Sequence, residues 1–352
     1  MKKLAMIGCG LIGDYHLDHF LLFKDIELVG FCDVLIDRAE AFVKKAGAGK
    51  AYSDFVKMYD ESSPDMVFIC VPPTCHGYIE FESIRRGIHF FVEKPLSLDA
   101  PLAKEIIRRV EENNIIAASG FQCRYDNINE EAKNYIQNNE ILHVAGSRIG
   151  GIPEVPWWRV KAVSGGQLIE QTIHNMDMLR YLLDDEPDTV YSVSTRGHVQ
   201  QSECPGYFTD DLSTTLVTFK SGLTATIVTG CYALGPACWE NKFIFGGRDS
   251  RMDYRLITDC TVYGADSSED KPEEEGGVVS GDGMIRSSGG VGKTVKTGDD
   301  PGVACDRTFI DAVISGDASK IRSPYEDAWK SVAFCLACNE SMETGLPVKV
   351  KY

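Results

Sequence analysis

Short apolar runs alternate with amphipathic stretches along the first third of the chain. The amphipathic stretches repeat apolar residues at helical spacing, and Ser53-Asp54 and Asp99-Ala100-Pro101 are typical helix starts. This alternation predicts a mostly parallel, doubly wound α/β sheet with helices on both faces. The expected strands lie near residues 3–8, 26–32, 65–71, 88–92 and 115–120, and the expected helices near 11–23, 36–46, 54–61, 75–87 and 99–113.

The pattern changes after residue 122. Alternating strand-like runs now dominate, and the run 212–219 followed by Lys220-Ser221-Gly222 predicts a strand and a turn. We therefore expect a first domain at 1–122 and a second, α+β domain with a mostly antiparallel sheet at 123–352. The closing helices of the second domain could pack back on the first domain. Expected strands lie near 143–149, 189–199, 211–219, 223–230, 241–246 and 252–262, and helices near 126–138, 167–183, 304–315 and 325–344.

Residues 264–302 form a long irregular segment. Its first part is acidic and its second part is rich in Gly and Ser. A loop of this length in a compact domain is usually functional or disordered. A surface insertion that helps assembly or rims a cleft and a plain mobile loop are equally supported.

Composition narrows the class of protein. The 352 residues carry 36 Lys and Arg against 52 Asp and Glu, a net charge of −16, which argues against binding to nucleic acid or to an anionic membrane. The chain has no apolar run as long as about 18 residues, so no transmembrane helix is predicted. The apolar stretch after Met1-Lys2-Lys3 is explained by a strand and a glycine turn, so we do not predict a signal peptide.

The 12 cysteines indicate a reducing compartment, the cytoplasm. Cys9, Cys32 and Cys70 fall in or beside predicted core strands, where Cys acts as a small hydrophobic residue. Cys335 and Cys338 form a C-x-x-C pair within a helical pattern and without a second pair, so helix packing is favoured over zinc binding or redox chemistry. We predict no metal site.

The first apolar run leads directly into a glycine motif. Gly8, Gly10 and Gly13 form G-x-G-x-x-G between a predicted strand and a predicted helix, and Asp33 ends the second apolar run 20 residues later. In this context the motif predicts a dinucleotide site, with the pyrophosphate at the helix N-terminus. Asp33 can accept hydrogen bonds from ribose hydroxyls and would repel a 2′-phosphate, and no Arg stands beside it in Cys32-Asp33-Val34-Leu35. NAD is therefore favoured over NADP.

The carboxyl edge of the predicted parallel sheet gathers further candidates. Val71-Pro72-Pro73, Glu93-Lys94-Pro95 and Gly120-Phe121-Gln122 each follow an apolar strand, and ligands of doubly wound folds bind at that edge. The Lys94 ammonium could stabilise an alkoxide that develops on a substrate. An ordinary surface lysine is equally compatible with the sequence.

A second candidate site follows Gly165-Gly166. Glu170 and His174 are four residues apart on one predicted helix, so they would share a face, and a carboxylate beside an imidazole raises its basicity. His174 could then take or return a hydroxyl proton. Weaker candidates are Arg124, which lies just past a strand edge and could bind substrate oxygens, and Trp157-Trp158-Arg159, where a Trp face suits a sugar ring. Tyr232 after a strand and His76 near the cofactor are also candidates.

With these motifs the chain resembles, over essentially its whole length, the Gfo/Idh/MocA oxidoreductases, the family of glucose–fructose oxidoreductase and inositol dehydrogenase. The resemblance implies an amino-terminal Rossmann domain and a carboxyl-terminal domain whose large open sheet lines the substrate cleft and often makes dimer or tetramer contacts. It rests on the glycine motif, Val71-Pro72-Pro73-Thr74-Cys75-His76, Glu93-Lys94-Pro95, Arg124 before Tyr125-Asp126, and Gly165-Gly166 through His174 and Asp177.

The resemblance also implies that Lys94 and His174 form a catalytic core with residue 170 as the partner of His174. Many members have Asp at that position and a third glycine where Gln167 stands. Glu170 keeps the charge and reaches farther, which leaves its division of roles with Lys94 open. The candidate cofactor contacts are Gly8, Gly10, Leu11, Ile12, Gly13, Asp33, Val71, Pro72, His76, Glu93, Lys94 and Gln122, and the candidate substrate contacts are Lys94, Arg124, Trp158, Arg159, Glu170, His174 and Tyr232.

Three functions are carried forward. The first is an NAD-dependent dehydrogenase that oxidises a secondary hydroxyl of a sugar, polyol or glycoside, with C3 of a glycoside among the possible positions, as a cytoplasmic homodimer or homotetramer. The second is a glycoside-processing enzyme that oxidises a ring carbon transiently, which permits elimination, and recycles its NAD internally. Net release of NADH separates these two. The third is a non-catalytic NAD-sensing regulator, against which the intact Lys94 and His174 argue.

Overall fold

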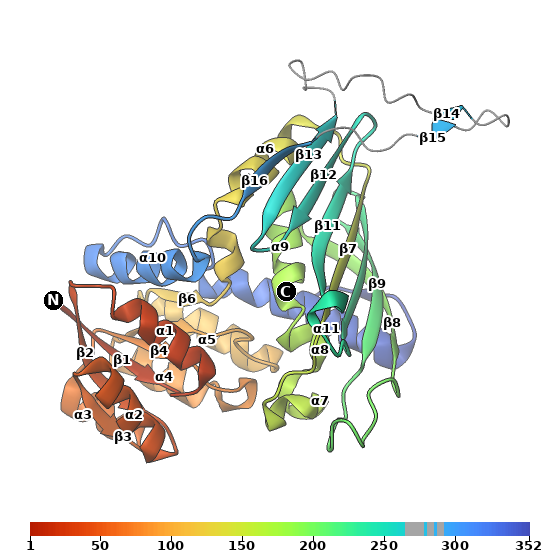
Figure 1. The fold of residues 1–352 in the computed structure, drawn as a ribbon. Coiled ribbons are helices and arrows are strands. Elements are labelled where there is room, and N and C mark those ends of the chain that lie inside the picture. The colour runs from red at the N-terminus through yellow and green to blue at the C-terminus, as the bar shows by residue number, and fades with distance from the viewer. Residues whose placement is uncertain (265–277, 280–284, 287–291) are drawn as a thin grey trace.

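The computed structural model describes residues 1–264, 278–279, 285–286 and 292–352. Its amino-terminal part is a six-stranded, wholly parallel sheet in the order β3-β2-β1-β4-β5-β6 (Figure 1). The strand order reverses at β1, which lies between β2 and β4. These strands are β1 (Lys2–Ile7), β2 (Ile26–Cys32), β3 (Lys50–Tyr52), β4 (Met66–Ile69), β5 (His89–Val92) and β6 (Ala117–Ser119).

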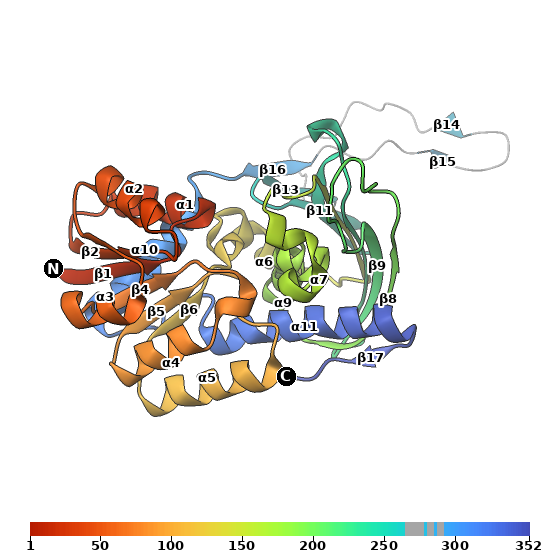
Figure 2. The ribbon, with the colours of Figure 1, turned by 90° about the horizontal axis from the view of Figure 1, so that it is seen from below.

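Helices cover both faces of this sheet because successive residues of a strand point to opposite faces. Leu4 and Met6 of β1 belong to one apolar core, and Ala5 and Ile7 belong to the other. The two helical layers are visible edge-on in Figure 2. The first core is covered by α1 (Leu11–Phe20), α2 (Ile36–Ala46) and α10 (Pro301–Ser315), and the second by α3 (Phe55–Ser62), α4 (Tyr78–Arg85) and α5 (Ala100–Glu112).

The second sheet has nine strands in the order β16-β13-β12-β11-β7-β10-β9-β8-β17. β7 and β10 pair in parallel, and every other neighbouring pair in this sheet is antiparallel. The strands are β7 (His143–Gly150), β8 (Pro187–Thr195), β9 (Leu212–Phe219), β10 (Thr224–Cys231), β11 (Glu240–Gly246), β12 (Ser250–Arg255), β13 (Asp259–Gly264), β16 (Lys293–Lys296) and β17 (Val348–Lys349), and β14 (Val278–Val279) pairs with β15 (Ile285–Arg286) apart from them.

One face of the second sheet is packed against helices and the other is open. The buried positions of β9 alternate with partly or fully exposed ones, and Tyr191, Val193 and Leu216 on the open face are 41%, 48% and 47% exposed. The sequence therefore has the one-sided alternation of an antiparallel sheet. The remaining helices are α6 (Ile128–Asn138), α7 (Lys161–Ser164), α8 (Gln167–Glu170), α9 (Ile173–Leu183) and α11 (Tyr325–Thr344), with 3-10 turns η1 (Pro73–Cys75), η2 (Gln122–Tyr125), η3 (Pro156–Arg159) and η4 (Pro236–Cys238).

The closing helices pack back on the first sheet. α10 lies against α1, and α11 contacts β6 as well as β8 of the second sheet. Just before α11, the Ser323 carbonyl accepts a hydrogen bond from the Ser119 N–H at 3.0 Å. The fold classes expected for the two parts, a doubly wound parallel sheet and an α+β part with a mostly antiparallel sheet, are confirmed, and the boundary at residues 122 and 123 stays a prediction.

Two expected elements are wrong in detail. The single strand near 252–262 is a hairpin, because Ile257 takes a positive φ of 51° and turns β12 back as β13. The helix near 167–183 is two helices, α8 and α9. Most of the irregular segment 264–302 lies outside the described residues, and its end forms β16. Within the described part of the chain, no helix has the length and apolar character needed to cross a membrane.

Candidate functional site

The glycine turn joins β1 to α1 at the carboxyl edge of the parallel sheet. Gly8 has a φ of +92°, and a Cβ there would lie 2.1 Å from the Cys70 carbonyl oxygen. A Cβ on Gly13 would lie 2.3 Å from the Gly8 carbonyl oxygen, so this glycine allows the helix to pack closely on the turn. Around Gly10, in contrast, no atom lies within 4 Å of such a Cβ, and no side chain caps the helix. The open side of the turn therefore presents free backbone N–H groups.

Asp33 stands beside this turn at the end of β2. Its Oδ2 accepts a hydrogen bond from the Cys9 N–H and its Oδ1 from the Leu35 N–H, both at 2.9 Å. These two bonds orient the carboxylate and leave further lone pairs on both oxygens. Leu11 and Val34 flank the turn with apolar side chains that are 79% and 89% exposed.

The other predicted cofactor contacts lie along the same sheet edge. Val71 and Pro72 follow β4 and are half-buried, as is Gln122 after β6, while Ile12 is 46% exposed at the start of α1. His76 is buried, and its Nδ1 lies 2.6 Å from Glu80 Oε1.

Lys94 is held by Glu170 from the second part of the chain. Its Nζ donates to the Glu170 backbone carbonyl at 2.9 Å and to Oε1 at 3.1 Å. The ammonium has three protons, so one donor remains for another oxygen. The side chains of Lys94 and Glu170 are only 12% and 11% exposed.

The expected pairing of Glu170 with His174 is not among the contacts of the described structure, and the single helix expected to carry both residues is broken between α8 and α9. The Thr172 N–H bonds to the Gln167 carbonyl, five residues back, at 3.0 Å, so the chain slips by one residue between α8 and α9. Glu170 therefore ends α8 while His174 lies in α9, so the two residues do not share one uninterrupted helix.

His174 has a different set of neighbours. Its ring lies edge-on to Phe121, with centroids 6.0 Å apart, and its Nδ1 is 3.9 Å from Cys123 Sγ. Burial, followed by the positive charges of Lys94 and Arg148, lowers the pKa of His174 to about 3. The imidazole is therefore uncharged at neutral pH.

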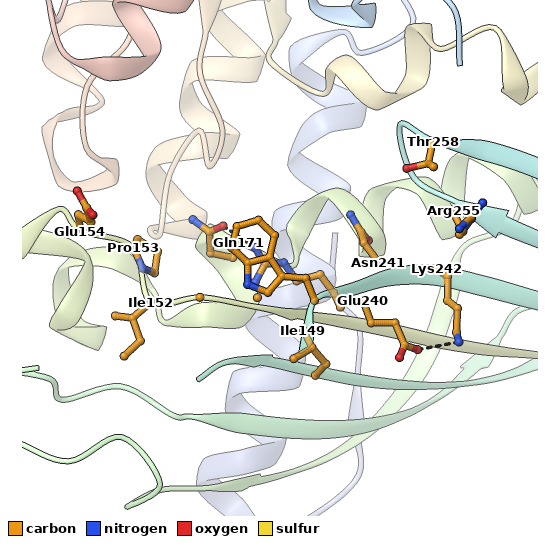
Figure 3. A pocket seen from close by; sticks show the side chains of 14 residues that line it. Ile149, Ile152, Pro153, Glu154, Gln171, Glu240, Asn241, Lys242, Arg255 and Thr258 are labelled. Atoms are coloured by element: carbon orange, nitrogen blue, oxygen red, sulfur yellow. Dashed lines mark hydrogen bonds and ion pairs between the residues drawn. The ribbon is translucent and has the colours of Figure 1, made fainter. Parts of the chain in front are cut away.

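A cavity of about 770 Å³ adjoins this centre (Figure 3). Gln171 and Asn241 lie on one side of the strands that form its floor, and Ile149 and the Glu240–Lys242 ion pair lie on the other. The volume is that of a typical small-molecule site. Its lining residues are Arg148, Ile149, Gly150, Gly151, Ile152, Pro153, Glu154, Gln171, Trp239, Glu240, Asn241, Lys242, Arg255 and Thr258.

A chain of hydrogen bonds connects the cavity to Lys94. Glu170 accepts from Lys94 through Oε1 and from the Gln171 amide through Oε2 at 2.6 Å. The Gln171 Oε1 in turn accepts from Arg148 Nη2 at 2.9 Å. The sequence analysis missed Arg148, Gln171 and Trp239, because nothing in their local pattern distinguishes them from polar or aromatic residues of an ordinary strand or loop.

Arg124, expected to bind substrate, is instead committed within the protein. Its Nε and Nη2 donate to Asp177 at 2.8 and 2.6 Å, and its Nη1 lies 2.6 Å from Asp327 Oδ2. Arg124 is 3% exposed and Asp177 is fully buried. Arg124 therefore joins η2, α9 and α11.

The other predicted substrate contacts, Trp158, Arg159 and Tyr232, make no described contact with Lys94 or His174. Trp158 is fully buried against Tyr207 in a small apolar cluster, so it cannot present a ring face to a sugar. Arg159 donates to the Pro205 carbonyl at 3.2 Å. Tyr232 is 37% exposed just after β10, with no described hydrogen bond to Lys94 or His174.

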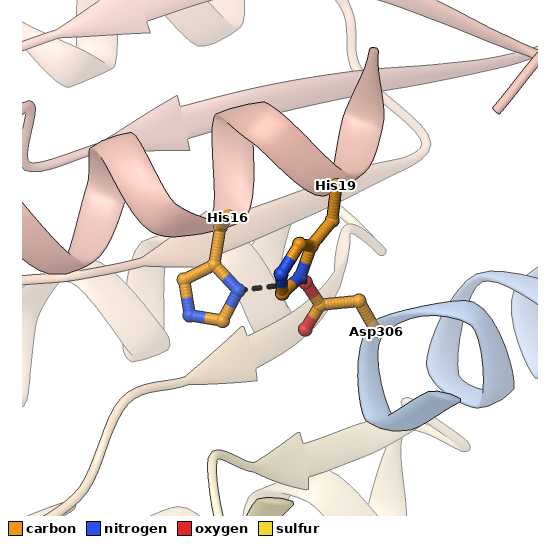
Figure 4. A group of neighbouring side chains, drawn as sticks. All are labelled: His16, His19 and Asp306. Carbon is orange, nitrogen blue, oxygen red and sulfur yellow. Dashed lines mark hydrogen bonds and ion pairs between the residues drawn. The ribbon is translucent and has the colours of Figure 1, made fainter. Parts of the chain in front are cut away.

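Glu93 belongs to a buried cluster that the sequence analysis did not foresee and whose members His16, His19 and Asp306 are drawn in Figure 4. His16 donates from Nε2 to Glu93 Oε1 at 3.1 Å, and from Nδ1 to Asp306 Oδ2 at 2.8 Å. The His19 Nδ1 reaches the same Asp306 oxygen at 2.7 Å. The residue types His16, His19 and Asp306 could hold a metal ion, but both imidazoles aim at one oxygen at hydrogen-bonding distance. Glu93 also accepts from the Lys94 N–H at 3.2 Å, so the cluster supports the Lys94 backbone.

The cysteines of α11 are part of its packing. Cys335 and Cys338 are fully buried, and burial raises the pKa of the Cys338 thiol to about 12. All 12 cysteines are free thiols.

Comparisons with known proteins match both parts of the chain. Residues 2–121 match the model of the oxidoreductase family with an NAD-binding Rossmann fold, and residues 131–252 match that of the GFO/IDH/MocA C-terminal domain. Myo-inositol 2-dehydrogenase of Thermotoga maritima is 30% identical over 274 residues, which are 76% of this chain and 80% of that protein. The NAD(+)-dependent scyllo-inositol 2-dehydrogenase of Bacillus subtilis is 30% identical over 64% of this chain and 66% of its own.

The fold is shared with solved structures as well. The crystal structure of myo-inositol 2-dehydrogenase from Lactobacillus plantarum superposes with a TM-score of 0.79 at 21% identity, over 99% of each chain.

Proposed function

The chain belongs to the Gfo/Idh/MocA family of NAD-binding oxidoreductases, and from this premise we propose that it oxidises a secondary hydroxyl of a sugar, polyol or glycoside. The observation that carries the proposal is the Lys94–Glu170 pair, which brings the carboxyl edge of the parallel sheet to the second part of the chain and is linked through Gln171 to a 770 Å³ cavity, with the positive charge of Lys94 acting on His174. Inositol dehydrogenases among the relatives support this class of substrate.

The glycine turn and Asp33 fit NAD. A pyrophosphate needs close backbone approach, and the space beside Gly10 is open while the N-terminus of α1 has no side-chain cap. The oriented Asp33 carboxylate is suited to ribose hydroxyls, and its charge disfavours a 2′-phosphate, which supports NAD over NADP. When bound, NAD supplies the hydride acceptor.

The chain's own residues position the substrate and handle its proton. The free donor of Lys94 would hold the reacting oxygen and stabilise negative charge on it, while Glu170 holds the ammonium in place. The uncharged imidazole of His174 can accept the hydroxyl proton, since its lowered pKa keeps it unprotonated at neutral pH. Glu170 acts on Lys94 rather than on His174.

Assembly and location are further parts of this proposal. The open sheet face with Tyr191, Val193 and Leu216 exposes apolar side chains of neighbouring strands, which favours a homodimer or homotetramer through that face. Twelve free thiols favour a reducing compartment such as the cytoplasm. Sedimentation of the purified protein tests the assembly.

The test of function is absorbance of NADH with NAD and a panel of inositols, hexoses, uronic acids and glycosides. We expect a substrate-dependent rise that Lys94→Met abolishes. The control is Lys57→Met, since the Lys57 side chain is 67% exposed on α3 and, among the residues that the structure describes, pairs with Glu61 alone. Consumption of a glycoside without NADH release would replace simple oxidation with internal recycling, and NAD binding with neither signal would contradict the proposed activity.

A further inference from the structure

Arg148 extends from β7 into the cavity without a carboxylate partner. Among the residues that the structure describes, no Asp or Glu oxygen lies within 4.0 Å of its guanidinium, whereas Arg124 and Arg180 each contact two or more carboxylates. Its contacts are the Gln171 Oε1 at 2.9 Å, Cys231 Sγ at 3.2 Å and the Gly230 carbonyl at 3.4 Å. A guanidinium has five N–H donors, so part of its capacity remains unused.

The charges around Arg148 leave this part of the cavity positive. Lys94 and Glu170 neutralise each other, His174 is uncharged at neutral pH, and Arg148 adds one positive charge. The Glu240–Lys242 pair lies across the strands (Figure 3), and Arg255 is bound to Asp259. Glu154, at the other end of the cavity, is exposed to water, which screens its charge. This positive site stands out in a chain of net charge −16.

We propose that Arg148 binds an anionic substituent of the substrate, a carboxylate or a phosphate, so that the enzyme acts on an acidic carbohydrate rather than a neutral one. The inference rests on the proposed function, because it assigns the substrate class of the same site. A planar guanidinium pairs with either group through two parallel hydrogen bonds. The half-buried position of Arg148 makes such a pair stronger than one at the surface.

The remaining cavity suits the carbohydrate itself. Trp239, 59% exposed at the cavity wall, offers an aromatic face for the apolar side of a sugar ring. Asn241, held by Asn175 at 2.7 Å, and Gln171 offer amide groups for hydroxyls. An anion on Arg148 would also offset one of the two positive charges that lower the pKa of His174, which makes the imidazole a stronger base once the substrate is bound.

The experiment compares matched ligands on the wild type, Arg148→Met and Arg148→Lys. The ligands are D-glucose, D-glucuronate and D-glucose 6-phosphate, with the corresponding galactose series. Two quantities are measured: kcat/KM with NAD, and the dissociation constant for the NADH-saturated protein by calorimetry. Arg251→Met is the control, because Arg251 pairs with Asp253 on β12 and does not line the cavity.

We expect an anionic ligand to bind at least roughly 10-fold more tightly than its neutral counterpart, and Arg148→Met to weaken it roughly 10- to 100-fold, as for one charged hydrogen-bonded pair. Neutral ligands should change by less than about 3-fold, and Arg148→Lys should fall between. The two anions identify carboxylate or phosphate as the group bound.

Two outcomes would overturn the inference. One is a wild type that binds no anion more tightly than the neutral sugar. The other is an Arg148→Met variant that weakens neutral and anionic ligands equally, which would make Arg148 a support for Gln171 and Glu170. Anion binding that depends on Arg148 without any NADH formation would instead uphold the subsite and refute the proposed dehydrogenase activity.

Discussion

Replacing His16 by Gln should change the pH dependence of stability. His16 is 1% exposed and lies between Asp306 and Glu93. Burial by itself lowers the pKa of His16, but the two carboxylates outweigh it and raise the pKa from 6.5 to about 10. Gln keeps a hydrogen-bond donor of similar size and removes the charge.

The magnitude follows from the difference in pKa between the folded and unfolded states. Each pKa unit corresponds to about 1.4 kcal/mol, so the charge on His16 contributes on the order of 5 kcal/mol below pH 6.5, where both states hold the proton. Above pH 6.5 the unfolded state loses its proton first. The contribution therefore falls by about 1.4 kcal/mol per pH unit and is gone above about pH 10.

Urea unfolding at about pH 7 and about pH 9 measures this slope. Wild type should lose roughly 3 kcal/mol more than His16→Gln over that interval. His89→Gln is the matched control: burial and Lys2 lower the pKa of His89, and its Nδ1 accepts from the Ile116 N–H, so it is neutral throughout. Parallel pH curves for wild type and His16→Gln would refute the reasoning.

Two further changes test individual residues. Arg124→Met leaves the charge of the buried Asp177 uncompensated and should destabilise the fold by about 3–5 kcal/mol, measured by urea unfolding. The KM of the folded enzyme should stay unchanged, and the double variant Arg124→Met/Asp177→Leu should recover part of the stability. A raised KM at unchanged stability would instead make Arg124 a substrate contact. Asp33→Ala should reduce the ratio of kcat/KM for NAD over NADP, and an unaltered ratio would show that Asp33 does not select the cofactor.

Local features of the site could be predicted from the sequence. The turn at Gly8 and Gly13 depends on contacts with Cys70 and Gly8 that follow from the strand–turn–helix context itself. Lys94 could be placed at the sheet edge because it follows a strand. In both cases the determining geometry lies within one βα unit and its neighbouring strand.

Helix breaks and side-chain partners could not be predicted. The break between Glu170 and His174 depends on a backbone slip at Thr172 that helical periodicity does not reveal. Arg124 and Arg148 both looked like polar residues at strand ends or within strands, yet one is neutralised by Asp177 and Asp327 and the other meets an amide. Which arginine remains free depends on residues that are remote along the chain.

The return of α10 to the first sheet has a consequence for synthesis on the ribosome. Cys305, Phe309, Ile310 and Val313 complete the apolar core that begins with Leu4 and Met6. While the chain is being made, α1 and α2 cover only part of that face of the parallel sheet until α10 has emerged. The nucleotide-binding half, although translated first, can therefore complete its native core only after the strands β7 to β16 of the second part and then α10 have left the ribosome.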